Sequence, residues 1–284
     1  MLRSTLFIAF CSLIITAANA TKSSDTLSVQ DIVALKIKAK ELFAQRDKKE
    51  KLEEGIKIME EILAKESDYE TMVLLSHSYY FFAEFHDDKI RKLELHEKGL
   101  NAGEMALGKI EKFAQAMKGG AKEEDAVKIL TKENIEALYW TAANLARWAK
   151  YSSFSKRVAA KSRIRYLWDK IHEIDATYFY GGAYRFFGGY YSLVPTITGD
   201  NDPVKSKEMF DKCVEVAPQY LETKVLYAEA YCTHGKVKNK ELFKKLIDEV
   251  INADLQKYPE IMPENKIAQE KAKKLLLQET ELFE

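Results

Sequence analysis

YFYGGAYRFFGGYYSLVP, the segment from Tyr178 to Pro195, combines aromatic residues at helical spacing with two glycine pairs and one charge, Arg185. Glycine lowers helix stability by about 0.5–1 kcal/mol relative to alanine, so four glycines are compatible with a helix only where tertiary contacts compensate. The segment therefore predicts a helix that packs inside a larger helical protein and that needs close approach or open space beside its glycines.

Apolar residues at helical spacing continue on both sides of this segment. EEGIKIMEEILAKE at 53–66 and ELFKKLIDEVINAD at 241–254 are two examples, and the chain has no sustained alternation of apolar and polar residues. Asp202 followed by Pro203 is typical of a helix start, as is Met262 followed by Pro263. We therefore predict an all-α fold, with a final helix over 263–284 that caps the array.

A degenerate repeat pattern indicates how the helices are paired. In tetratricopeptide (TPR) repeats, a large-small-x-x-Tyr element on the first helix lets the second helix approach closely. The second-helix pattern of such repeats fits once, from Ser206 through Phe210 and Cys213 to Pro218. We predict cryptic TPR-like helical-hairpin repeats that form a single compact domain over residues 21–284. The first-helix element occurs at Leu75-Ser76-x-x-Tyr79, Tyr180-Gly181-x-x-Tyr184 and Tyr227-Ala228-x-x-Tyr231.

The N-terminus has the features of a secretion signal. Arg3 supplies a positive charge, Leu6 to Ile15 an apolar run, and Ala18-Asn19-Ala20 a small-x-small cleavage pattern. An uncleaved anchor is the alternative, but the apolar run is shorter than the ~20 residues that span a bilayer. Cys11 follows a bulky phenylalanine within the apolar run, which disfavours lipidation. We predict a signal peptide over residues 1–20, cleavage after Ala20 and export to the periplasm.

Charge and cysteine content narrow the function classes. The chain of 284 residues has 44 basic and 44 acidic residues, so it lacks the overall basicity of a nucleic-acid binder. Removal of the signal would leave Cys213 and Cys232. On a hairpin that turns near Pro218 these two would be offset by about 13 Å at 1.5 Å per residue, too far for a disulfide. We predict two buried, free thiols.

Arg185 is the first candidate for a binding residue. On a helical wheel, Tyr180, Tyr184, Phe187 and Tyr191 share an apolar stripe typical of a core. On another side of the helix, Arg185 is surrounded by Gly181, Gly182, Gly188 and Gly189, which leave a trough without side chains. Gly181 also fits the packing position of the repeat. Either a second helix fills this trough and Arg185 meets a buried carboxylate, or the trough lines a cavity in which Arg185 binds a carboxylate ligand through two parallel hydrogen bonds.

A basic segment adds a second group of candidates. RWAKYSSFSKRVAAKSRIR at 147–165 has seven basic residues and no acidic one. Such a run is commonly a solvated face. Here, however, it follows ALYWTAANLARW at 137–148, a helix that is apolar on nearly every side, and one face of that helix mixes aromatic and polar residues as binding surfaces do. The candidate ligand contacts are Arg185, Tyr178, Gly182, Gly189, Trp140, Asn144, Trp148 and Tyr151.

The sequence contains no recognisable catalytic or metal-binding motif. The five histidines have no HExxH or paired-ligand spacing, and no G-x-S-x-G, P-loop or Rossmann fingerprint occurs. Cys213 falls on a repeat core position, so a structural role is favoured over a nucleophilic one. We therefore expect a protein that is not an enzyme and that needs no cofactor.

The block LYWTAANLARWAKYSS at 138–153, together with the segments at 162–195 and 202–231, resembles the T component of tripartite ATP-independent periplasmic (TRAP) transporters. The resemblance is densest over Tyr139–Tyr231. It implies an all-helical fold of cryptic TPR-like repeats, a homotrimer with a pore or hydrophobic cavity, and association with the periplasmic solute-binding subunit of a transporter for organic acids or other small hydrophobic ligands. Some members carry a lipid-modified cysteine, a feature from which this chain departs.

Two functions are compatible with these patterns. The first is a transport accessory protein that binds a solute-binding subunit and a small organic anion or hydrophobic ligand. The second is a non-catalytic TPR-like scaffold that recruits a peptide or an assembly factor in the cell envelope. The two differ in one respect, because a pure scaffold needs no internal cavity.

Overall fold

The computed structural model describes residues 29–196 and 199–284, and the predicted signal peptide lies outside them. The predicted all-α fold is confirmed, since no strand occurs in the described part of the chain. Short helical pieces connect several of the long helices. The elements are α1 (Val29–Ala44), α2 (Lys49–Lys65), α3 (Tyr69–Phe82), η1 (Ala83–Phe85), α4 (Lys89–Leu107), α5 (Glu111–Lys118), α6 (Glu123–Val127), η2 (Lys132–Asn134), α7 (Ile135–Tyr151), α8 (Phe154–Asp175), α9 (Tyr178–Leu193), α10 (Pro203–Val216), α11 (Glu222–Leu226), the π-helical η4 (Tyr227–Cys232), α12 (Lys240–Ile251), η5 (Leu255–Lys257), η6 (Pro259–Ile261), α13 (Met262–Leu277) and α14 (Glu279–Phe283).

Side-chain caps fix where the helices begin. The Asp202 carboxylate accepts hydrogen bonds from the backbone N–H groups of Val204 and Lys205, both at 3.1 Å, so α10 begins at Pro203 as predicted. Asp68 caps α3 in the same way, and Asn239 caps α12. These polar side chains satisfy N–H groups that have no partner within the helix.

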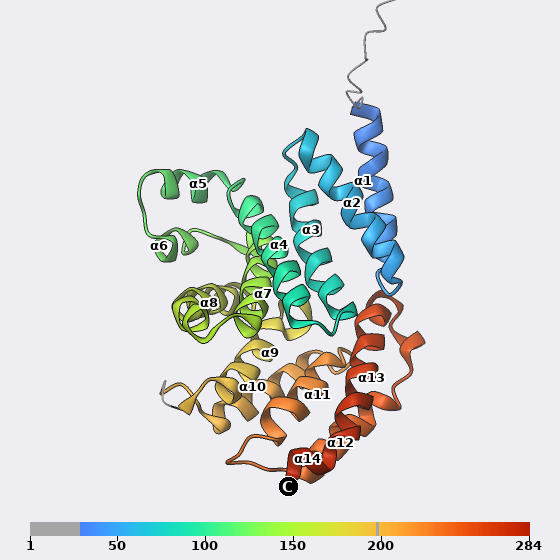
Figure 1. The fold of residues 1–284 in the computed structure, drawn as a ribbon. Helices are drawn as coiled ribbons and strands as arrows, with labels where there is room; N and C mark the ends of the chain where they lie inside the picture. The colour runs from blue at the N-terminus through green and yellow to red at the C-terminus, as the bar shows by residue number, and fades with distance from the viewer. Residues whose placement is uncertain (1–28, 197–198) are drawn as a thin grey trace, which may run out of the picture.

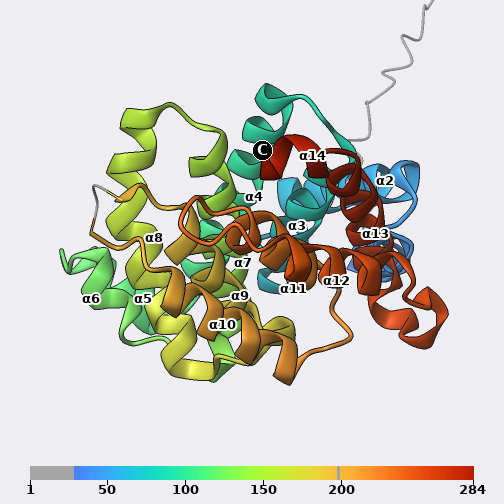
Figure 2. The same cartoon turned by 90° about the horizontal axis from the view of Figure 1, so that it is seen from below.

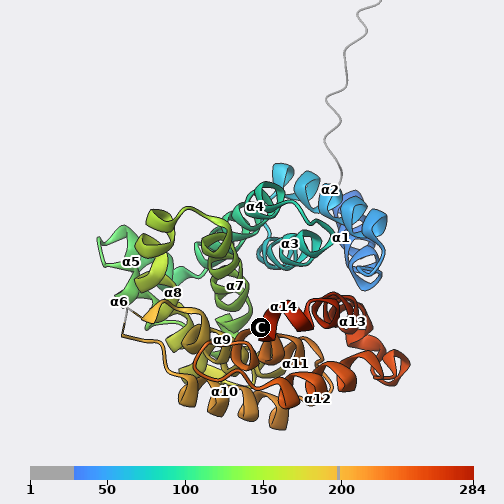
Figure 3. The same ribbon diagram turned by 60° about the horizontal axis from the view of Figure 1, so that its bottom comes forward.

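Successive helices lie side by side in an array that curves back on itself (Figure 1). The array runs from α1 through α4 to α7 and α8, and continues through α9 and α10 to α13, while α5 and α6 project from one side (Figure 2). In Figure 3 the N-terminal helices and the C-terminal helices form two facing rows, and α13 lies near α1 and α2. The last long helix thus returns to the start of the array.

Ion pairs join the two ends of the array. Arg46, in the connection between α1 and α2, binds Glu264 of α13 with N–O distances of 2.9 and 2.8 Å. Lys271 of α13 contacts Glu84 of η1 at 3.1 Å, and Lys274 contacts Asp87 at 3.3 Å. The C-terminal helix therefore closes the array in addition to covering its end.

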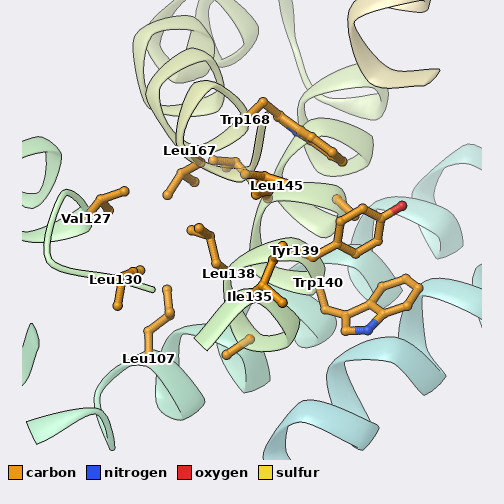
Figure 4. Close-up of a cluster of buried hydrophobic side chains, with 14 of the residues drawn as sticks. Leu107, Val127, Leu130, Ile135, Leu138, Tyr139, Trp140, Leu145, Leu167 and Trp168 are labelled. Atoms are coloured by element: carbon orange, nitrogen blue, oxygen red, sulfur yellow. The ribbon is translucent and has the colours of Figure 1, made fainter. Parts of the chain in front are cut away.

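The main hydrophobic core surrounds α7. Leu138 and Leu167 are fully buried, and Trp140 and Trp168 are 2% and 3% exposed. Figure 4 shows side chains of this cluster converging from α7 and α8. Separate clusters lie between α1 and α4 and between α10 and α13. Because α7 packs against α3, α4 and α8, it forms the centre of the N-terminal half.

The close packing of α9 on α10 explains two of the glycines. A Cβ atom on Gly188 would lie 2.8 Å from the ring of Phe210, and the Ser206 hydroxyl donates to the Gly188 carbonyl oxygen at 2.7 Å. Gly181 faces Cys213 in the same interface. Gly181 lies at a close approach of two helices, as the repeat pattern predicts, whereas the assignment of the array to TPR-like repeats stays a prediction.

Two further expectations have clear outcomes. Cys213 and Cys232 are both free and buried, as predicted. The predicted final helix over 263–284 is instead divided at Gln278 into α13 and α14. None of the helices in the described residues combines the length and the hydrophobicity needed to cross a bilayer.

Candidate functional site

The start of α9 departs from right-handed helical geometry. Phe179, Tyr180 and Gly181 have φ angles of 45°, 58° and 70°, all in the left-handed region. Glycine adopts this region readily, but a bulky residue does so at a cost. The wheel prediction fails at this point, because Tyr180 leaves the regular helix and only Phe187 of the predicted core stripe is fully buried. The other members of the stripe, Tyr180, Tyr184 and Tyr191, are half-buried.

Arg185 lies one turn further along α9 and points back toward this left-handed turn. Its side chain is buried, with 8% exposed. Nη1 donates to the Tyr180 carbonyl oxygen at 2.9 Å, while Nη2 donates to the Phe179 carbonyl oxygen at 3.3 Å and to the Tyr139 hydroxyl at 3.1 Å. The guanidinium also lies over the Tyr220 ring, 4.5 Å from its centroid. Arginine stays protonated in proteins, so this is a buried positive charge.

The charge of Arg185 has no carboxylate partner among the described residues. Its contacts are carbonyl oxygens, a phenol and an aromatic face, so one of the two predicted arrangements, pairing with a buried carboxylate, does not occur within that part of the chain. Three of the five guanidinium N–H groups are used, including both on Nη2. The two that remain are on Nη1 and Nε and do not form a parallel fork. The bidentate contact expected from the sequence therefore requires one existing hydrogen bond to be exchanged.

Two tyrosines beside Arg185 were not identified from the sequence. Burial raises the pKa of Tyr139 to about 12, although Arg185 acts in the opposite direction. Burial likewise raises the pKa of Tyr220 well above its usual value. Both hydroxyls therefore keep their protons at neutral pH. Since the Tyr139 oxygen accepts from Arg185, its own proton is free to be donated to a ligand.

These groups lie at one end of a cavity of about 560 Å³. Its walls are mainly apolar and come from α3, η1, α7, α8, α9, α11, η4 and α13, on both sides of the closed array. The other end lies where α8 begins and α9 ends, and its exposed apolar side chains include Phe154, Val158 and Leu193, which are 68%, 57% and 58% exposed. The volume lies within the usual range of about 300–1,000 Å³ for small-molecule sites.

Charged residues are spaced along the apolar walls. Glu222 lies between Lys271 and Arg147, at 2.9 and 3.6 Å, and Lys271 also contacts Glu84 at 3.1 Å, so two carboxylates balance these two cations. Glu264 is paired with Arg46. Cations on the wall outnumber carboxylates, six to four. The cations are Arg147, Lys150, Arg157, Lys161, Arg185 and Lys271, and the carboxylates are Glu84, Glu222, Glu229 and Glu264.

The glycines of α9 belong to two faces of the helix. Gly182 and Gly189 line the cavity beside Arg185, but a Cβ atom on Gly182 would lie 2.4 Å from the Tyr139 ring and one on Gly189 would lie 3.3 Å from Leu226. Gly188 was predicted to keep space around Arg185, but it faces Phe210 and is a packing position like Gly181. The trough is therefore narrower than predicted. The reason is that the wheel assumed a regular helix from Tyr178, whereas the regular helix begins after Gly181.

The other predicted contacts lie away from the cavity walls. Asn144 is fully buried, where its amide donates to the Ser76 and Trp140 carbonyl oxygens and its Oδ1 contacts His96 Nδ1 at 3.1 Å. It therefore joins α7 to α3 and α4. The remaining predicted residues have aromatic or cationic partners of their own: Trp140 stacks on His77, Lys156 lies over Trp148, Tyr151 stacks on His96, and Tyr178 packs edge-on against Tyr139.

The cavity is lined by a face of α7 next to the predicted face. Tyr139, Ala143, Ala146 and Lys150 line it, rather than the predicted face that begins at Trp140. One residue along a helix turns the side chain by about 100°. Ala143 and Ala146 could have identified this face from the sequence, because small side chains on one face of a helix leave room for a ligand.

The basic segment is divided in its role. Arg147, Lys150, Arg157 and Lys161 line the cavity. By contrast, Arg163 is held between Glu104 and Glu123 at 2.7 and 2.6 Å, and Arg165 pairs with Asp169. The first part of the segment thus faces the cavity and the last part forms surface ion pairs.

No group of three or more His, Cys, Asp or Glu residues in the described ranges is arranged to hold a metal ion. His77 and His96 are occupied by the aromatic and amide contacts described above.

Comparison with known proteins identifies the family. The family model described as TRAP transporter T-component matches residues 49–283, which include every wall of the cavity. A search of curated proteins gives no match to this chain. The match extends well beyond the segment on which the sequence resemblance rests. The chain therefore belongs to the T-component family of TRAP transporters and is an accessory component of such a transporter.

Proposed function

We propose that this T component works in the periplasm, where it binds the transporter's solute-binding subunit and holds an apolar organic acid in its cavity. Export through a signal peptide over residues 1–20, cleavage after Ala20 and the absence of a lipid at Cys11 are parts of this proposal. So is assembly as a homotrimer, which rests on family resemblance. The ligand's carboxylate binds at Arg185, beside Gly182 and Gly189, and its apolar part extends along the cavity.

The observation that carries the proposal is the unpaired charge of Arg185 beside an apolar cavity. Removing a charge from water is costly unless another group compensates. Carbonyl oxygens and an aromatic ring compensate partly, but no carboxylate does so among the described residues. A ligand carboxylate would supply the missing negative charge, and the hydroxyls of Tyr139 and Tyr220 would supply further donors.

The opposite end of the cavity suits an anionic ligand with an apolar body. Lys150 and Arg157 stand there beside exposed apolar side chains of α8 and α9. Basic groups around a low-dielectric opening raise the local concentration of anions. The apolar walls then favour an alkyl or aromatic body over a sugar, which would leave its hydroxyl groups without partners.

The ligand part is tested by calorimetric titration of the mature chain with decanoate as a probe, and with decan-1-ol as the uncharged comparison. We expect decanoate to bind and Arg185→Met to weaken binding about 10- to 100-fold, because a charge-assisted hydrogen bond contributes about 1.5–3 kcal/mol. Arg91→Met, which removes an exposed arginine outside the cavity, is the matched control. Equal affinities of the Arg185→Met and unmodified chains would contradict the proposal.

The partner part is tested by a crosslinked pull-down of the tagged mature protein from its native envelope. We expect a solute-binding protein at near-stoichiometric yield. Recovery of assembly factors alone would favour the scaffold function. The cavity supports the first outcome, since a pure scaffold gains nothing from an interior space with an unpaired cation.

A further inference from the structure

The left-handed turn over 179–181 is the most unusual backbone feature of the cavity wall. Two of its three residues are aromatic, and each non-glycine residue in this region costs about 1–3 kcal/mol. Such conformations persist only where the surroundings hold them, and they are concentrated at binding sites and switches. The contacts that hold this turn therefore indicate what could release it.

Two side chains hold the turn through its carbonyl oxygens. Arg185 donates to the carbonyls of Phe179 and Tyr180, at 3.3 and 2.9 Å. From the other side, the Cys213 thiol donates to the Gly181 carbonyl at 3.2 Å. Cys213 belongs to the closely packed α9–α10 interface, whereas Arg185 faces the cavity. Of the two, only Arg185 is accessible to a ligand.

Carboxylate binding at Arg185 competes with this role. A bidentate carboxylate needs two parallel N–H donors, either on Nη1 and Nη2 or on Nε and Nη2. Both pairs include Nη2, whose N–H groups bind Tyr139 and the Phe179 carbonyl. The contact to Phe179 is the longest of the three that Arg185 donates, so it is the one most readily exchanged.

Phe179 is placed to transmit such an exchange. Its side chain lines the cavity and, apart from the rings of its chain neighbours Tyr178 and Tyr180, contacts four other rings. Two of them, Tyr139 and Tyr220, lie beside Arg185, with centroids 5.2 and 5.7 Å away. The other two, Trp140 and His77, lie beyond the wall at 4.7 and 5.5 Å. A movement of Phe179 would therefore change the packing on both sides of the wall.

We propose that Arg185 is a latch: in the empty protein it holds the left-handed turn through the Phe179 and Tyr180 carbonyls, and a bound carboxylate takes the place of the Phe179 carbonyl and loosens the turn. The ligand half of this inference rests on the proposed function, whereas the holding half does not. The latch makes the position of Phe179 depend on whether the cavity contains an anion.

The holding half is tested without ligand, by hydrogen–deuterium exchange on the full mature chain. We expect the amides of residues 179–182 to exchange at least ~10-fold faster in Arg185→Met, because the turn loses one of its two supports. Arg185→Lys, which cannot reach both carbonyls at once, should lie between. Arg91→Met is the control for removal of an arginine elsewhere. Unchanged exchange at 179–182 in a folded Arg185→Met protein would overturn the latch.

The ligand half uses the unmodified protein with saturating decanoate, with binding followed separately by calorimetry. Faster exchange at 179–182 with decanoate, and not with decan-1-ol, supports the latch. Binding that depends on Arg185 but leaves this exchange unchanged overturns the latch and leaves the proposed function standing. An absence of decanoate binding contradicts the proposed function and with it the ligand half of the latch, whereas the holding half is decided by the first experiment.

Discussion

Asn144 shows how a polar residue on a central helix can serve structure instead of ligand binding. Its amide and carbonyl groups are satisfied by Ser76, Trp140 and His96, at distances of 3.0 to 3.2 Å. Gly99 makes room for it, because a Cβ there would lie 2.5 Å from the Asn144 oxygen. The sequence predicted Asn144 as a ligand contact, whereas its partners lie on helices whose positions cannot be inferred from sequence spacing.

This network predicts a pH dependence of stability. Burial lowers the pKa of His96 to about 4, although the bond with Asn144 acts in the opposite direction. Because the unfolded chain takes up the proton near pH 6.5, the stability contributed by neutral His96 is complete above pH 6.5 and falls between pH 6.5 and about 4. The loss at pH 4.5 should be roughly 2–3 kcal/mol, at 1.36 kcal/mol per pKa unit.

His96→Asn should reduce this pH dependence, since asparagine still donates to Asn144 but does not titrate. Urea unfolding at pH 7 and pH 4.5 measures the difference. His172→Asn, at an exposed position, is the control. If the two variants lose the same free energy of unfolding on acidification, His96 does not carry the effect.

Helix α9 has a packing face and a cavity face, and adjacent glycines lie on different faces. Gly188 and Gly189 are adjacent, yet the first faces the buried Phe210 ring and the second faces the cavity and the tip of Leu226. This division follows from the helical turn of about 100° per residue. It also gives a matched test of what the glycines do.

We expect Gly188→Ala to lower the free energy of unfolding by about 1–3 kcal/mol, because the new methyl group would lie 2.8 Å from the Phe210 ring. Gly189→Ala meets only the flexible Leu226 side chain at 3.3 Å. It should be neutral or slightly stabilising, since alanine favours a helix by about 1 kcal/mol. Thermal unfolding of both variants checks this. Equal destabilisation would show that the two faces are not distinct.

The sequence predicted some features of these elements and not others. The start of α10 followed from Asp202 and Pro203, and the buried thiols followed from the hairpin spacing. The left-handed start of α9 could not be predicted, because only Gly181 signals it and the two aromatic residues before it favour other conformations. The predicted binding face of α7 is wrong by one residue. Because α7 is apolar on nearly every side, a helical wheel does not distinguish the face that lines the cavity from its neighbours.

At the scale of the molecule, the site exists because the array closes. Arg185, Tyr139 and Tyr220 come from segments far apart in the sequence, and α13 completes the wall of the cavity. Sequence patterns predict how each helix pairs with its neighbours in the chain. They do not predict that the last helix packs against the first. Arg185 could be singled out as a lone charge among glycines and aromatics, whereas its tyrosine partners could not.

The buried pair Arg46–Glu264 is the strongest test of this closure. The two residues are 9% and 7% exposed. Arg46→Met should destabilise the chain by about 3–5 kcal/mol, because it leaves the Glu264 carboxylate buried and unpaired. The double variant Arg46→Met/Glu264→Met should recover most of that loss.

Urea denaturation of the single and double variants measures this coupling. Lys207→Met, which removes half of an exposed pair with Asp211, is the control and should cost about 1 kcal/mol or less. Additive losses in the double variant would show that closure does not depend on this pair.

The placement of the tryptophans has an optical consequence. All three tryptophans of the chain, Trp140, Trp148 and Trp168, lie on α7 and α8. Their fluorescence therefore arises from α7 and α8, in the N-terminal half of the array, and α10 to α14 emit no tryptophan light. Far-ultraviolet circular dichroism, by contrast, averages over every helix. If both signals change at the same urea concentration, the two halves of the chain unfold together. Comparing the two signals therefore distinguishes unfolding around α7 and α8 from unfolding of the whole molecule.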